Sequence, residues 1–238
     1  MKLIPNTLTF LALMMGLGAL YVAALGHLEW AIYLLVLSGV FDKADGAAAR
    51  LLNCESSFGA RLDSYADAVN FGFVPAIIVF YWSGPHDGFA GLVTPVACLV
   101  YVTCAIARLI RFTRHRLTQP DNAKPPRFFT GVPTPAGAAL ALLPVMLYLE
   151  TGLPAVRDSY LISAWMVLIG LLMISTLPAY KLALNGENRT VRRWQMLVTG
   201  AILLLSFIAT LKTIIVLDIA YLVSVPLCYG LLRRSVKG

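Results

Sequence analysis

The chain has 238 residues, of which 59% are hydrophobic and 13% are charged, and its formal net charge is +7. A soluble domain of this size needs more polar surface than this composition supplies, so the composition excludes a soluble globular protein and indicates a polytopic membrane protein. The positive charge is explained by membrane topology and gives no support to nucleic-acid binding.

Apolar runs of about 20 residues, the length that crosses the hydrocarbon core as a helix, predict eight transmembrane helices. The runs fall near residues 7–26, 30–49, 63–82, 89–110, 134–150, 159–178, 194–212 and 214–232. We therefore expect an all-α polytopic membrane protein. Residues 1–182 would form a six-helix core, and residues 183–238 would form a C-terminal helix pair.

Basic residues are distributed unequally between the segments that connect these helices. If the N-terminus is cytosolic, seventeen of the 19 lysines and arginines lie on the cytosolic side, and only Arg157 and Lys212 lie on the other. Positive charge is enriched in cytosolic loops. We expect an integral protein of the cell membrane with both termini in the cytosol.

Acidic residues are concentrated in one short stretch, where Asp42, Asp45, Asp63 and Asp67 make up four of the twelve in the chain. On helices, the first two are three residues apart and the last two four apart, so each pair shares one helix face. The polar segment 51–58 predicts a short cytosolic connection between two antiparallel helices. This hairpin would bring the four carboxylates together near the cytosolic face.

Carboxylates inside a membrane are costly unless they are hydrated or neutralised. Hard oxygen ligands favour Mg²⁺ or Mn²⁺, so the pattern predicts a site for one or two divalent ions. One alternative is that the acids are solvated helix ends that pair with Lys43, Arg50 and Arg61. Another is a cation or proton transporter, but that function predicts acids along a path through the membrane, whereas these four lie at one depth.

Small residues accompany the carboxylates at intervals of one helical turn. Gly46 and Ala49 follow the first pair, and Gly59 precedes the second. Their missing side chains open a slot in which an extended ligand approaches the backbone. Close packing of helices is the alternative explanation, and the two are compatible. Arg50 follows at the rim, where a guanidinium group is suited to bind a phosphate.

The spacing D-x-x-D-G-x-x-A-R-x8-G-x3-D-x3-D, over residues 42–67, resembles the signature of the CDP-alcohol phosphotransferase family. The resemblance implies an integral membrane enzyme that transfers a phosphatidyl-type group from a CDP-alcohol to an acceptor hydroxyl and releases CMP. It also implies that Asp42, Asp45 and Asp63 ligate metal. Asp67 would bridge to a second ion and act as the general base.

The same resemblance assigns the small residues to the nucleotide. It implies that Gly46, Ala49 and Gly59 line the cytidine pocket and that Arg50 holds the pyrophosphate. Asn6 has two candidate roles, since it either caps the first helix or contacts the nucleotide.

Further motifs are similar to the phosphatidylserine synthase branch of this family, in residues 4–6, 51–75, 107–112, 129–136 and 175–181. That similarity implies CDP-diacylglycerol and L-serine as substrates. Ala68 follows the fourth aspartate, where relatives with a phosphorylated acceptor tend to place a basic residue, and this favours an unphosphorylated acceptor. Inositol, glycerol phosphate, inositol phosphate and choline remain alternatives.

Three residues are candidates for binding the acceptor. Arg108 and Arg111 lie three apart at a helix end and either bind the serine carboxylate or anchor the helix at the cytosolic face. Asn70, one turn beyond Asp67, either contacts the acceptor or satisfies a neighbouring backbone carbonyl. Helix faces rich in small residues also lead us to expect a homodimer.

Overall fold

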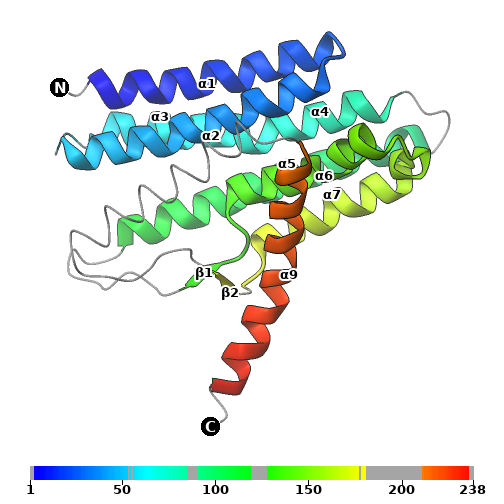
Figure 1. Ribbon diagram of the computed structural model, residues 1–238. Helices are drawn as coiled ribbons and strands as arrows, with labels where there is room; N and C mark the ends of the chain where they lie inside the picture. Colours follow the sequence, from blue (N-terminus) through cyan, green and yellow to red (C-terminus); the bar gives the residue numbers. More distant parts are fainter. Residues whose placement is uncertain are drawn as a thin grey trace.

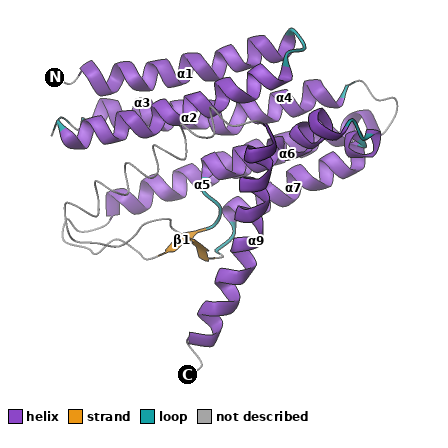
Figure 2. Cartoon of the chain, viewed as in Figure 1, coloured by secondary structure: helices purple, strands orange, loops and turns teal. Residues whose placement is uncertain are grey.

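The structure is a computed structural model that describes residues 3–52, 54, 56–84, 90–118, 128–176, 178–180 and 211–235. Helices dominate these residues (Figure 2), which confirms the predicted fold class. The predicted helix at 194–212 lies almost entirely outside the described residues. The division of the chain at residue 182 therefore stays a prediction.

The first two helices form an antiparallel hairpin. Helices α1 (Leu3–Ala24) and α2 (Leu28–Leu51) lie side by side along their length (Figure 1). Gly26 in the turn between them has a φ of 86°, a conformation that glycine adopts without steric cost. The hairpin places the signature residues in the second half of α2 beside the start of α1.

The third segment is one continuous helical rod of three parts. It consists of α3 (Ser57–Asp67), a π-helical stretch over Ala68–Phe73, and α4 (Val74–Ser83). Ser56 caps its start, because the Ser56 Oγ accepts a hydrogen bond from the Gly59 backbone N–H at 3.0 Å. The rod thus begins six residues before the predicted span, and Asp63 and Asp67 lie in its first part, α3.

Three further helices complete the bundle. Helix α5 (Ala90–Thr118) packs against α7 (Ser159–Ile174), and α6 (Thr134–Thr151) contacts α4 and α7. Two three-residue strands, β1 (Phe128–Thr130) and β2 (Pro178–Tyr180), pair antiparallel below these helices (Figure 1). Helix α7 ends four residues before its predicted limit, and the chain is extended from Pro178, a residue that disfavours helix.

The last described helix, α9 (Leu211–Ser235), crosses the others steeply (Figure 1). Its first turns bury Leu211, Ile214 and Ile215 in the main core, and it contacts α6 and β2. A helix at this position was predicted, but its steep crossing of the bundle was not.

Among the described residues, four helical segments are long and apolar enough to cross a membrane. They cover Pro5–Ala24, Ser57–Ser83, Gly91–Arg114 and Thr134–Thr151, and Ser159–Ile174 is a shorter apolar helix. Together with the composition, these segments show an integral membrane protein.

Arg111 joins α5 to the end of α7. Its guanidinium donates hydrogen bonds to the carbonyl oxygens of Ile174 at 2.6 Å and of Met173 and Ser175 at 3.3 Å. These carbonyls belong to the last turn of a helix and have no intrahelical partner, so a basic side chain stabilises them. Gly131, with a φ of 80°, passes so close to the same turn that no side chain would fit.

Asn70 joins the π-helical stretch to the first hairpin. The Asn70 side chain is 1% exposed, and its Nδ2 donates to the Ala12 carbonyl at 3.0 Å and to the Ser38 Oγ at 2.7 Å. Nearby, the Tyr101 hydroxyl donates to the Phe71 carbonyl at 2.8 Å. These bonds tie together three segments that position the carboxylates.

Gly16 makes room for this amide, because a Cβ at residue 16 would overlap the Asn70 Oδ1. We predict that Gly16→Ala destabilises the protein by about 1–3 kcal/mol, the usual cost of overpacking a core. Gly18→Ala is the matched control, since its Cβ would meet only Leu34, at 3.9 Å. Thermal unfolding of the purified variants in detergent measures the difference. Equal unfolding temperatures for the two variants would contradict the role of Asn70 in holding the helices together.

Candidate metal and nucleotide site

Three of the four predicted carboxylates form a cluster contributed by the C-terminal half of α2 and by α3. Asp42, Asp63 and Asp67 each offer one oxygen, and these oxygens all lie within 4.8 Å of one another. All three side chains are partly buried. The prediction that the two helices present their acids to each other is thus matched by the geometry for these three residues.

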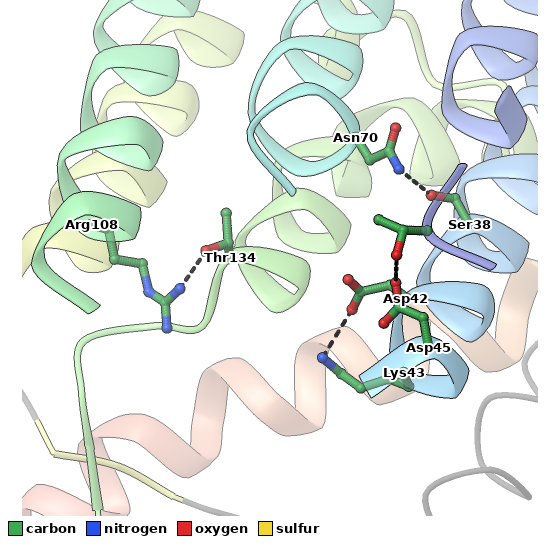
Figure 3. Close-up of polar contacts among 8 residues, drawn as sticks. Ser38, Asp42, Lys43, Asp45, Asn70, Arg108 and Thr134 are labelled. Carbon is green, nitrogen blue, oxygen red and sulfur yellow. Dashed lines mark hydrogen bonds and ion pairs between the residues drawn. The ribbon is translucent and has the colours of Figure 1, made fainter. Parts of the chain in front are cut away.

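Asp45 points elsewhere, although it lies only one turn from Asp42. Its side chain is 4% exposed and accepts a hydrogen bond from the Thr9 hydroxyl of α1 (Figure 3). The Thr9 hydroxyl also lies 3.1 Å from the Pro5 carbonyl. Thr9 therefore orients the fourth carboxylate from the neighbouring helix, which sequence reasoning missed. The three-residue spacing from Asn6 to Thr9 was the available signal.

The electrostatics of the cluster favour a bound cation. Lys43 donates to Asp42 at 3.1 Å (Figure 3), so one of the predicted pairings with basic residues does form. The Lys43 side chain is 56% exposed. One such group does not offset the mutual repulsion of three carboxylates this close together. In addition, the Asp67 Oδ1 is buried and has no hydrogen-bond partner among the described residues. Clustered oxygen ligands of this kind fit a divalent metal ion.

A cavity of about 390 Å³ opens beside the cluster. Asp45 and Asp63 form part of its wall, and four of the predicted nucleotide-binding residues line it, namely Asn6, Gly46, Ala49 and Gly59. Its size falls within the range of small-molecule sites. The small residues of α2 and α3 thus open a space directly next to the carboxylates.

Asn6 lies directly beside Gly59 in the wall of this cavity. A Cβ at residue 59 would lie 2.9 Å from the Asn6 Oδ1 and 3.1 Å from the Ser56 Oγ. The capping role of Asn6 is excluded, because α1 already includes Leu3 and Asn6 lies within the helix. Arg50 lies in the last turn of α2, and its side chain lies outside the described residues.

The predicted acceptor residues lie in different surroundings. Arg108 is 7% exposed and donates to the Thr134 hydroxyl (Figure 3), whereas Arg111 is bonded to the end of α7. Asn70 uses its amide group to join helices, as the second of its two predicted roles requires. Arg108 also interacts electrostatically with Asp67.

The arrangement is suited to transfer chemistry at a phosphate. A cluster that holds a divalent cation neutralises phosphate charge, and an adjacent cavity holds the rest of the ligand. Asp67, with an unpartnered buried oxygen at the cluster, is placed to accept a proton.

Comparison with known proteins gives consistent matches. The model of the CDP-alcohol phosphatidyltransferase family matches residues 2–156. A CDP-diacylglycerol–serine O-phosphatidyltransferase of Mycobacterium leprae is 32% identical over 186 residues, which cover 76% of this chain and 59% of that protein. The protein of the same name from Mycobacterium tuberculosis (strain H37Rv) is 27% identical over 234 residues, covering 95% of this chain and 78% of that protein.

A relative from a second genus carries the same name. The Helicobacter pylori (strain 26695) protein is 30% identical over 181 residues, which cover 75% of this chain and 73% of that protein. The matched part thus spans about three-fifths of the Mycobacterium leprae relative and about three-quarters of the other two.

We predict that Asp42→Asn and Asp63→Asn each weaken Mn²⁺ binding by more than about tenfold, because second-shell changes alone cost 10–100-fold. Electron paramagnetic resonance of free Mn²⁺, titrated with purified protein, measures the affinity. Glu29→Gln is the control, since Glu29 is an exposed acid in the first turn of α2, at the opposite end of that helix. Wild-type affinity in both aspartate variants would show that the cluster is not the metal site.

Proposed function

The chain belongs to the CDP-alcohol phosphatidyltransferase family, and we propose that it transfers the phosphatidyl group of CDP-diacylglycerol to the hydroxyl of L-serine. The products are phosphatidylserine and CMP. The observation on which the proposal rests is the carboxylate cluster of Asp42, Asp63 and Asp67 beside a cavity lined by Asn6 and Gly59. The names of the relatives support serine as the acceptor.

The metal is Mg²⁺ or Mn²⁺, and the proposal places two ions at the four signature aspartates. Asp42, Asp63 and Asp67 fit this role because their oxygens already lie within 4.8 Å of one another. Asp45 joins them from the cavity wall, where the Thr9 hydroxyl orients it. When bound, the ions neutralise the diphosphate and lower the barrier to its displacement.

The cavity holds the cytidine nucleotide. Gly46, Ala49 and Gly59 leave space for a flat ring near the backbone, and Asn6 supplies hydrogen-bonding groups beside it. Arg50, at the end of α2, binds the pyrophosphate. The acyl chains of the substrate stay in the bilayer, which explains why the site lies at the end of membrane helices.

Transfer proceeds by direct attack of the serine hydroxyl on the β-phosphorus, the one that bears the diacylglycerol group. The Asp67 carboxylate removes the hydroxyl proton, the new O–P bond forms, and the bond to the CMP phosphate breaks, with the electron pair leaving on CMP. The buried, unpartnered Oδ1 of Asp67 supports this role. A carboxylate that accepts few hydrogen bonds keeps its lone pairs available for a proton.

The proposal also includes topology and assembly. The active site and both termini face the cytosol, which is supported by the unequal distribution of the 19 basic residues. Two copies of the chain form a homodimer, as small-residue faces on membrane helices favour.

Purified protein with CDP-diacylglycerol and Mg²⁺ or Mn²⁺ should release CMP when L-serine is added. Inositol, glycerol phosphate, inositol phosphate and choline, each tested alone, should give no more CMP than water. Greater release with any of these than with serine would overturn the acceptor assignment. Asp67→Asn should lower turnover by several orders of magnitude while CDP binding is retained, whereas Glu29→Gln should leave both unchanged.

We predict that Gly59→Ala raises the KM for CDP-diacylglycerol several-fold, because its Cβ would lie 2.9 Å from the Asn6 Oδ1 and narrow the cavity. The unfolding temperature should change little, since alanine favours the helix and the Asn6 side chain is able to shift. Steady-state kinetics and thermal unfolding separate the two effects. Gly18→Ala again serves as control, and an unchanged KM in Gly59→Ala would place the nucleotide elsewhere.

A further inference from the structure

Arg108 lies in a buried polar region that the signature does not include. Its side chain is 7% exposed, one guanidinium nitrogen bonds to Thr134, and the ring of Phe112 lies 5.8 Å from its Cζ. The Arg108 Nε is buried and has no hydrogen-bond partner among the described residues. Buried donors are nearly always hydrogen-bonded because leaving one unpartnered is costly, so this nitrogen indicates a missing polar partner.

Two more unpartnered atoms lie close to Arg108. The hydroxyl of Tyr221 on α9 and the Oδ1 of Asp67 on α3 are both buried without a partner in the described part of the chain. Both residues are near enough to Arg108 to interact with it electrostatically. Three segments within electrostatic range of one another therefore carry unsatisfied buried polar atoms, as is expected where a ligand makes the missing hydrogen bonds.

Asp218 lies one turn before Tyr221 on the same face of α9. It is 8% exposed, and its Oδ2 is buried with no partner among the described residues. It forms part of the wall of a cavity of about 170 Å³, together with Phe71 and Pro135. Phe71 follows Asp67 by one turn, and Pro135 adjoins Thr134, the partner of Arg108. Asp218 is thus a neighbour of the same region.

The charges of this region are complementary to a zwitterion. Arg108 and Tyr221 offer donors suited to a carboxylate, and the buried Asp218 carboxyl group, among mostly apolar neighbours, is stable as a carboxylate only when a cation pairs with it. An amino acid supplies both charges on adjacent atoms. Inositol, glycerol phosphate and inositol phosphate carry no cation, and choline carries no anion.

We propose that α9 completes the acceptor site and determines its specificity for an amino acid, with Tyr221 and Arg108 binding the carboxylate and Asp218 binding the ammonium group. The inference rests on the proposed function, since it identifies how that site selects serine. The hydroxyl then points toward Asp67. Helix α9 lies outside residues 2–156, which match the family model, so this specificity is added to the shared catalytic part.

The test compares acceptors that lack one charge. Ethanolamine keeps the ammonium group without the carboxylate, and 3-hydroxypropionate keeps the carboxylate without the ammonium group. Tyr221→Phe and Asp218→Asn should each raise the KM for serine at least tenfold, with the KM for CDP-diacylglycerol unchanged. Asp218→Asn should lower the ratio of kcat/KM for serine to kcat/KM for 3-hydroxypropionate. Tyr221→Phe should lower the corresponding ratio for serine and ethanolamine.

Val223→Ala is the control, because Val223 lies on α9 with 53% of its surface exposed. If both variants keep the wild-type KM for serine and the wild type shows serine-dependent CMP release, the role of α9 is overturned and the proposed function stands. Absence of serine-dependent release in the wild type would overturn the proposed function and this inference together. If Asp218→Asn does not fold, Tyr221→Phe alone decides, since a phenyl ring keeps the packing and removes only the hydroxyl.

Discussion

Mutual repulsion among carboxylates is the constraint on which the rest of this structure depends. Three aspartates with oxygens within 4.8 Å of one another lie at the end of helices that are otherwise apolar. In the low dielectric of a membrane, such a cluster separates or takes up protons unless a cation neutralises it. The neighbouring helices must therefore hold it together whether or not a ligand is bound.

The surrounding helices hold the cluster together through buried hydrogen bonds that lie further inside the bundle. The Asn70 amide joins the π-helical stretch to α1 and α2, and the Tyr101 hydroxyl joins it to α5. In an apolar environment a satisfied hydrogen bond of this kind is difficult to exchange, because no water competes for it. The π-helical stretch begins directly after Asp67, so the same bonds that hold the helices also fix the position of that carboxylate.

Much of the fold and of the metal site was predictable because both depend on local pattern. Apolar length predicted the helices, and the three- and four-residue spacings predicted that Asp42, Asp63 and Asp67 would face one another. Contacts between distant segments were not predictable. The bond from Arg111 to Ile174 joins residues 63 apart, and nothing in the local sequence distinguishes a helix-capping arginine from a membrane anchor.

Isolated polar residues in apolar runs were missed for a related reason. Thr9 is three residues from Asn6 and Tyr221 is three residues from Asp218, but a single spacing of this kind is a weak signal, so each looks like an ordinary helix residue until its neighbours are known. Asp218 is a single acid in a long apolar run, and only its buried, unpartnered oxygen marks it. Asp45 differs because the sequence did predict a role for it. Its spacing predicted a place in the carboxylate cluster, but its side chain is bonded to the Thr9 hydroxyl and lines the cavity instead.

The two proposed substrates are then bound by different ends of the chain. Residues of α1, α2 and α3 line the nucleotide cavity, whereas Arg108 on α5 and two residues of α9 surround the proposed acceptor. Asp67 is the group common to both, since it belongs to the carboxylate cluster and interacts with Arg108. A change on α9 therefore alters the acceptor without moving the carboxylates. Because the acceptor residues are separate from the metal ligands, substitutions among them change which alcohol is bound without rearranging the three clustered carboxylates.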